Sequence, residues 1–194
     1  MKNLILIILS IIILSYYVNE YNLVEDIKDE IRIKIYNGLT IIFILLLVYY
    51  SLFYNFTQGL YSTFITWCML IVSTPIPEAG LLISIPLKNL FNINLDITQW
   101  VVSFVSLLII YFLYYNYNYT LKQSKAGMYA LKIINLNMYS IFIYSILSSV
   151  SISYLINEFI DFYVYKSKIE NIEIYGFISI LSIILYIIQF RNII

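Results

Sequence analysis

Three carboxylates are the groups in this sequence that could do chemistry together: Glu78, Glu158 and Asp161. Glu78 interrupts one long apolar stretch, and Glu158 and Asp161 close another, about one helical turn apart. Carboxylate oxygens are the ligands that hard cations prefer in proteins. We therefore hypothesise that the three side chains converge in an acidic mouth that binds a cation or a small solute.

The segment around Glu78 breaks a helix. It reads Ser73-Thr74-Pro75-Ile76-Pro77-Glu78-Ala79-Gly80, and Pro75 and Pro77 lack the N–H that a helix interior needs. Each apolar piece beside the break is shorter than the roughly 20 residues that cross a bilayer. The pieces form one broken span, a span followed by an interfacial half-helix, or a re-entrant hairpin. We favour one broken span over residues 60–86, with Pro75, Pro77 and Gly80 as the break.

Glu78 itself has two interpretations. Pro77 suits the first turn of a new helix, where the positive end of the helix dipole favours a carboxylate, so Glu78 could simply start a half-helix near the headgroups. Broken helices that carry carboxylates also form ion and proton sites in transporters. Counted from Leu60 at the helical rise, Glu78 lies roughly 27 Å along the span, near its far interface. That position favours the first interpretation.

Much catalytic chemistry is excluded by residue type. The chain has no histidine and one cysteine, Cys68, within an apolar stretch. Disulfides within the chain, imidazole or thiolate metal sites, and Ser-His or Cys-His nucleophiles all need residues that are missing. No phosphate-binding glycine loop or metalloprotease motif is present either. We expect no enzyme activity, no metal site of a standard type and no cofactor.

The composition is that of an integral membrane protein. Of 194 residues, 62% are hydrophobic and 11% are charged, against about 25% charged in an ordinary soluble domain. The 11 basic and 11 acidic residues balance, so the sequence gives no electrostatic reason to expect nucleic acid as a partner.

The sequence predicts an all-α membrane protein: a polytopic bundle of about six transmembrane helices, forming a single integral membrane domain over residues 1–194. A polar connector over residues 19–36 has apolar residues at helical spacing, which predicts an amphipathic helix, although the alternation over 31–35 also allows a short strand. The predicted spans cover residues 4–18, 37–54, 60–86 (broken), 99–115, 138–156 and 174–190.

Six crossings place both ends of the chain in the cytoplasm. The segment 116–137 then also faces the cytoplasm, and it carries Lys122, Lys125 and Lys132 without a single acid. Loops rich in lysine and arginine stay on the cytoplasmic side of membranes. A re-entrant hairpin at the break would place this segment on the opposite side, which the same rule disfavours.

For function, the sequence favours a non-catalytic subunit or assembly factor of a membrane complex. The expected partners are the lipid bilayer and other membrane subunits or further copies of the chain. The alternative is a small channel or transporter for a cation or small solute, built around the Pro-x-Pro-Glu break. The membrane in which the protein resides does not follow from the sequence.

Overall fold

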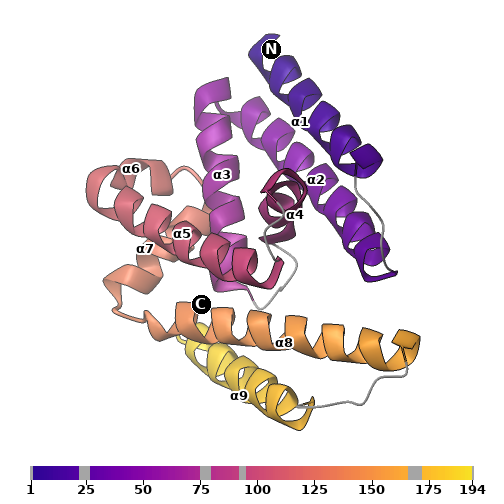
Figure 1. Cartoon of the computed structure of the whole chain (residues 1–194). Helices are drawn as coiled ribbons and strands as arrows, with labels where there is room; N and C mark the ends of the chain where they lie inside the picture. The colour runs from indigo at the N-terminus through magenta and orange to yellow at the C-terminus, as the bar shows by residue number, and fades with distance from the viewer. Residues whose placement is uncertain (1, 22–26, 75–79, 92–94, 166–171, 194) are drawn as a thin grey trace.

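A computed structural model describes residues 2–21, 27–74, 80–91, 95–165 and 172–193. All regular structure in these ranges is helical, which confirms the all-α prediction (Figure 1). The helices are α1 (Lys2–Tyr21), α2 (Ile27–Phe53), α3 (Phe56–Ser73), α4 (Leu81–Phe91), α5 (Leu95–Asn116), α6 (Asn118–Leu121), α7 (Lys125–Asn135), α8 (Ser140–Tyr165) and α9 (Ile172–Arg191).

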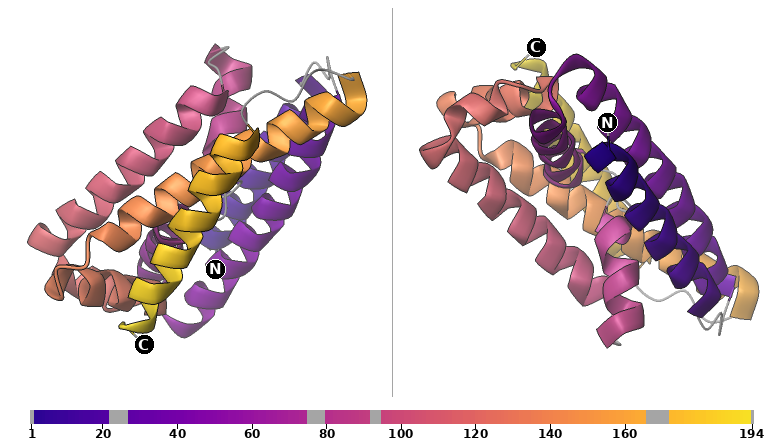
Figure 2. Two further views of the ribbon diagram at one scale, coloured as in Figure 1. Left: turned by 90° about the horizontal axis from the view of Figure 1, so that it is seen from below. Right: turned by 90° about the horizontal axis from the view of Figure 1, so that it is seen from above.

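Helix α2 absorbs much of the polar segment that we expected to form a connector. Residues 27–36 are its first turns, and the stretch 31–35 is helical rather than extended. Nothing between residues 27 and 53 stops a helix, and Glu30 and Lys34 form a 2.6 Å ion pair at the spacing that supports one. Helices α1 and α2 lie side by side (Figure 2), with the Ser15 hydroxyl donating to Asn37 Oδ1 at 3.3 Å.

A tight turn joins α2 to α3, as the sequence predicts. Asn55 is the N-cap of α3, and its side chain accepts a hydrogen bond from the Gln58 N–H at 2.9 Å. The two helices approach most closely at Gly59. A Cβ atom there would lie 2.7 Å from Ser51 Oγ and 2.8 Å from Ser51 Cα, so a residue without a side chain is required.

Helix α3 is the centre of the bundle. It contacts α2, α5, α7 and α8, and half of its 18 residues are buried. The largest core cluster includes Trp67, Ile71 and Val72 from α3, and extends to Ile110 of α5 and Phe142 of α8. Phe43 of α2 meets the Trp67 ring edge to face at 5.4 Å.

The contacts of α4 bear on the choice between a broken span and a re-entrant hairpin. It packs against α1, α2 and α5, and not extensively against α3. Leu81 and Ile85 of α4 bury the ring of Tyr36 from α2. We expected the span to end at residue 86, but the helix continues to Phe91. Pro86 lies inside it, where its missing N–H costs one hydrogen bond.

Helix α7 is amphipathic and ends in a defined stop signal. It buries Gly127, Ala130 and the apolar residues of its last two turns and exposes both of its lysines. Asn137 has φ of 56°, and the N–H groups of Asn137 and Met138 bond back to Ile134 and Ile133 at 3.0 and 2.9 Å. These two bonds form a Schellman motif. The chain then turns by 120° into α8.

Helices α8 and α9 form an antiparallel pair that lies across the lower end of α3 in Figure 1. Small side chains let the two helices approach. Five serines of this helix pair are buried, and four of them donate a hydrogen bond to a backbone carbonyl of their own helix. The five are Ser145, Ser148 and Ser151 on α8, and Ser179 and Ser182 on α9.

Among the described residues, fewer helices than the six predicted are long and apolar enough to cross a membrane. Three qualify: Glu30–Phe53, Ile97–Asn116 and Ile172–Arg191. A fourth is counted if α7 and Ser140–Ile156 are taken as one bent unit. The described side chains of α1 contribute a shorter apolar helix, Leu4–Tyr17. Helix α3 carries Gln58 and several serines and threonines, which a helix enclosed by protein tolerates.

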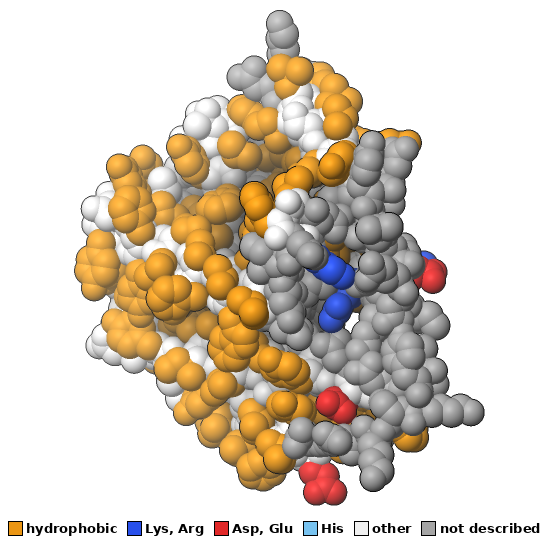
Figure 3. All heavy atoms as spheres, viewed as in Figure 1, with side chains coloured by type: hydrophobic (Ala, Val, Ile, Leu, Met, Phe, Trp, Pro, Cys, Tyr) orange, Lys and Arg blue, Asp and Glu red, His pale blue; other side chains and the backbone are white. Residues whose placement is uncertain are grey.

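Most of the described surface in Figure 3 is apolar. Hydrophobic side chains cover most of the described atoms in this view, and charged side chains are confined to its right half. Isoleucine, leucine and aromatic side chains of α1, α2, α5 and α9 are among those most exposed. An apolar surface of this extent fits contact with lipid or with other membrane proteins.

Candidate functional site

The centre of the predicted break lies outside the described residues. Pro75, Pro77 and Glu78 fall in the segment 75–79, so the acidic mouth stays a prediction. Gly80 is described and buried, and a Cβ atom there would lie 3.9 Å from Gln99 and Val102 of α5. That distance is ordinary contact, so the space around Gly80 does not by itself demand a glycine.

Glu158 and Asp161 occupy consecutive turns of α8. Glu158 is half-buried, and the side chain of Asp161 lies outside the described residues. The structure therefore neither joins these carboxylates to Glu78 nor separates them from it. Within the described ranges, no three histidine, cysteine, aspartate or glutamate side chains are close enough to hold a metal ion.

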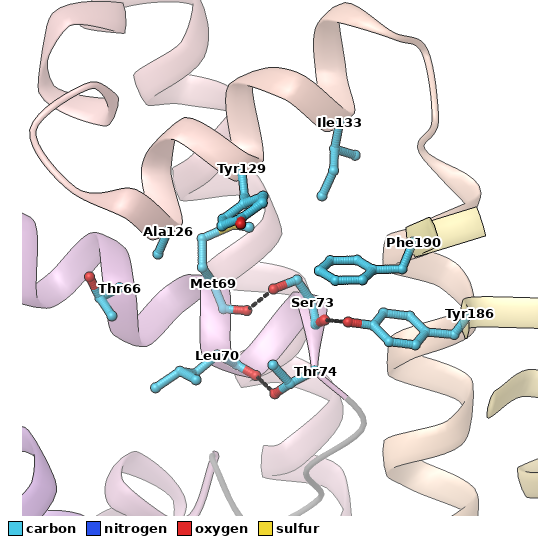
Figure 4. Close-up of a pocket in the computed structure, with 10 residues that line it drawn as sticks. All are labelled: Thr66, Met69, Leu70, Ser73, Thr74, Ala126, Tyr129, Ile133, Tyr186 and Phe190. Atoms are coloured by element: carbon cyan, nitrogen blue, oxygen red, sulfur yellow. Dashed lines mark hydrogen bonds between the residues drawn. The ribbon is translucent and has the colours of Figure 1, made fainter. Parts of the chain in front are cut away.

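The last turn of α3, directly before the break, is held by three hydroxyl groups (Figure 4). Ser73 Oγ donates to the Met69 carbonyl at 2.6 Å, and Thr74 Oγ1 donates to the Leu70 carbonyl. The Tyr186 hydroxyl of α9 donates to the Ser73 carbonyl at 2.6 Å. A helix end leaves its last carbonyls without partners in the helix, and the Tyr186 hydroxyl supplies a donor to one of them, the Ser73 carbonyl, two residues before a proline.

A cavity of 190 Å³ lies beside this helix end. Figure 4 shows residues of α3, α7 and α9 around it. Met69, Ile133 and Phe190 make much of the wall apolar, and Tyr186 contributes both its ring and its hydroxyl. The cavity has room for a small apolar or weakly polar molecule, and its described lining holds no charged side chain.

Sequence reasoning predicted the break but not the contact of Tyr186 with the helix end before it. The sequence does mark this tyrosine as unusual, because it lies inside the apolar stretch Ile183-Ile184-Leu185-Tyr186-Ile187-Ile188. A tyrosine hydroxyl inside a membrane helix needs a hydrogen-bond partner in the protein. The pattern therefore predicts a partner for Tyr186 without revealing that the partner is the Ser73 carbonyl.

Carboxylate, lysine and arginine side chains are not found in the interior of the described bundle. The buried polar side chains that are not aromatic are serines and threonines, and no described Asp, Glu, Lys or Arg is among the buried residues. Many of the hydroxyls bond to a carbonyl one turn earlier in their own helix, as Thr40 and Thr63 do at 2.9 Å.

No protein-family model matches the chain, and no curated protein or solved structure shows significant similarity to it.

Proposed function

We propose that the chain is a multi-pass integral membrane protein that serves as a non-catalytic subunit or assembly factor of a membrane complex. The observation that carries the proposal is the interior of the described bundle, in which no Asp, Glu, Lys or Arg side chain is buried. Charged groups inside a membrane protein are usually the ones that move ions or protons. A bundle built without them is suited to structural contact.

The exposed surface supports a partner protein. In the apolar stretch of α9 only 11% of the residues are buried, and in the apolar stretch of α2 only 17% of the residues are buried. Helix α1 exposes apolar side chains such as Ile5, Leu6 and Ile13 on its surface. Partner subunits would therefore cover these faces.

We further propose the six-crossing layout with α3 and α4 as one broken crossing. Support comes from the packing of α4 on α1, α2 and α5, because a re-entrant hairpin would return along α3. The Lys132 ammonium donates to the Ile193 carbonyl, and the α2–α3 turn shares a cavity with Lys122 and Lys125. These contacts bring the C-terminal end, the α2–α3 turn and the basic segment to one side.

A test of the subunit role is purification of the tagged full chain from its own membrane in mild detergent. We expect co-elution with one or more fixed polypeptides in constant ratio. Single-copy elution, or elution as a homo-oligomer that contains no other protein, would contradict the proposal. Glu78→Gln should leave the co-elution unchanged, because the proposal gives Glu78 no role in partner contact.

The second candidate is a small channel or transporter, which the 190 Å³ cavity beside the break favours. In this function the acidic mouth of Glu78, Glu158 and Asp161 would bind the cation or solute. Flux through proteoliposomes of the purified chain tests it. Loss of flux in Glu78→Gln, Glu158→Gln and Asp161→Asn, without loss of folded protein, would support transport over the subunit role.

A further inference from the structure

A second cavity, of 340 Å³, lies between the carboxyl end of α2 and the corner that joins α6 to α7. Its volume is at the small end of the range for small-molecule pockets, large enough for a headgroup but not for a whole lipid. The polar and aromatic residues of its wall include Tyr49, Tyr50, Tyr54, Lys122, Gln123 and Lys125. This cavity has no part in the function proposed above.

The cavity has an excess of positive charge. The segment 116–137, which supplies both lysines, contains no aspartate or glutamate. Among the described residues neither lysine has an ion-pair partner. The carboxyl end of α2 contributes about half a negative unit and the amino end of α7 about half a positive unit, so the helix ends cancel. The charges of Lys122 and Lys125 are left uncompensated.

Donors for an anion line the same wall. Ser124 is the N-cap of α7 and accepts from the Gly127 N–H at 2.9 Å, whereas helix geometry leaves the N–H groups of Lys125 and Ala126 without an acceptor inside the helix. The Oε1 atom of the Gln123 amide is buried and has no hydrogen-bond partner among the described residues. Its amide can turn to present two further N–H donors.

The other wall is an aromatic cluster of the kind found at headgroup depth. The rings of Tyr49 and Tyr50 meet edge to face at 5.3 Å, and Tyr49 contacts Phe53 at 4.8 Å. Tyr50 stacks on Tyr54 at 6.4 Å. Tyrosines gather at the membrane interface, where the ring meets acyl chains and the hydroxyl meets headgroups. Helix α7 buries its apolar face in the bundle and leaves Lys125 exposed.

From these observations we infer that the cavity binds the phosphate of an anionic phospholipid, with Lys122 and Lys125 as its cationic ligands and the α2 tyrosines beside the glycerol backbone. The inference rests on membrane insertion and not on the subunit role. If the unmodified chain shows no preference for an anionic lipid but co-elutes with fixed partners, the lipid site alone is wrong. If it shows the preference but elutes without any other protein, the subunit role alone is wrong.

The test uses the full chain in mild detergent and measures lipid adducts by native mass spectrometry. The probes are phosphatidylglycerol and phosphatidylcholine with identical acyl chains, and inorganic phosphate. We expect phosphatidylglycerol to bind about 30-fold more tightly than phosphatidylcholine, as two lysines at a membrane surface provide. The double variant Lys122→Gln/Lys125→Gln should lose this preference.

The matched control is Lys132→Gln/Arg191→Gln, which removes the same charge from residues outside the cavity. It should keep the preference for phosphatidylglycerol. Equal losses in both double variants would mean that general surface charge attracts the lipid, and the proposed site would be wrong. Equal binding of the two lipids by the unmodified chain would also overturn it, and saturation by inorganic phosphate that blocks the lipid preference would assign the cavity to a free anion instead.

Discussion

The hydroxyl of Tyr186 donates a 2.6 Å hydrogen bond to the backbone carbonyl of Ser73, 113 residues earlier in the chain. This bond ties α9 to the last turn of α3, directly before the proline-containing break. The Ser73 carbonyl belongs to a helix end, so it has no acceptable partner in lipid and needs one in the protein.

Tyr186→Phe should lower the free energy of unfolding by about 1 to 3 kcal/mol, because it leaves a half-buried carbonyl without its donor. Thermal unfolding in detergent, followed by tryptophan fluorescence, measures the change. Tyr175→Phe is the control, since the recorded contact of Tyr175 is ring stacking on Tyr154 at 5.0 Å, which phenylalanine keeps. Equal effects of the two substitutions would show that the tether does not stabilise the fold.

Gly59→Ala should destabilise the α2–α3 pair. The new Cβ would lie 2.8 Å from Ser51 Cα, so the two backbones must separate, at a cost of about 1 to 3 kcal/mol. Gly38→Ala in α2 is the matched control, because nothing lies within 4 Å of its Cβ position. It should raise the unfolding temperature slightly, since alanine favours a helix by up to about 1 kcal/mol. A destabilising Gly38→Ala of similar size would contradict the packing explanation.

Asn137→Val should destabilise the turn that ends α7. Asn137 has φ of 56°, where a β-branched residue is strained by about 1 to 2 kcal/mol and glycine is not strained. Circular dichroism during heating in detergent should give a lower midpoint for Asn137→Val and an unchanged or higher one for Asn137→Gly. If both variants unfold at the same temperature, the left-handed conformation at this residue is not needed for the turn into α8.

The basic segment should be reachable from the cytoplasmic side. In a Cys68→Ala background, Asn118→Cys places one thiol at an exposed position beside Lys122. A membrane-impermeant maleimide should label it in inside-out vesicles and not in right-side-out vesicles. Labelling with the opposite sidedness would reverse the proposed six-crossing layout. The unsubstituted chain is the control, because Cys68 is 3% exposed and should resist labelling until the protein unfolds.

Local patterns in the sequence predicted the helices well. The break after Ser73 coincides with the described end of α3, and the predicted amphipathic spacing over 27–36 lies in a helix. The separate connector over 19–36 did not appear in its described part, because no residue between 27 and 53 stops α2. Amphipathic spacing identified a helix there but could not show that the helix continues into the next span.

Long-range contacts were beyond sequence reasoning. Composition suggested six spans, but a helix surrounded by others needs no uniformly apolar surface, and α3 falls in this class. The partners Tyr186 and Ser73, and the approach of Gly59 to Ser51, depend on how helices pack and leave no periodic pattern. The acidic mouth stays a prediction, since Glu78 lies outside the described residues.

The mass of the particle extracted from its own membrane tests the proposed subunit role most directly. One chain has a mass of 22.9 kDa. Native mass spectrometry after mild solubilisation should give a particle whose protein mass is not a multiple of this value and which releases at least one other polypeptide in fixed ratio. A particle that contains this chain alone, in one or several copies, would contradict the subunit role.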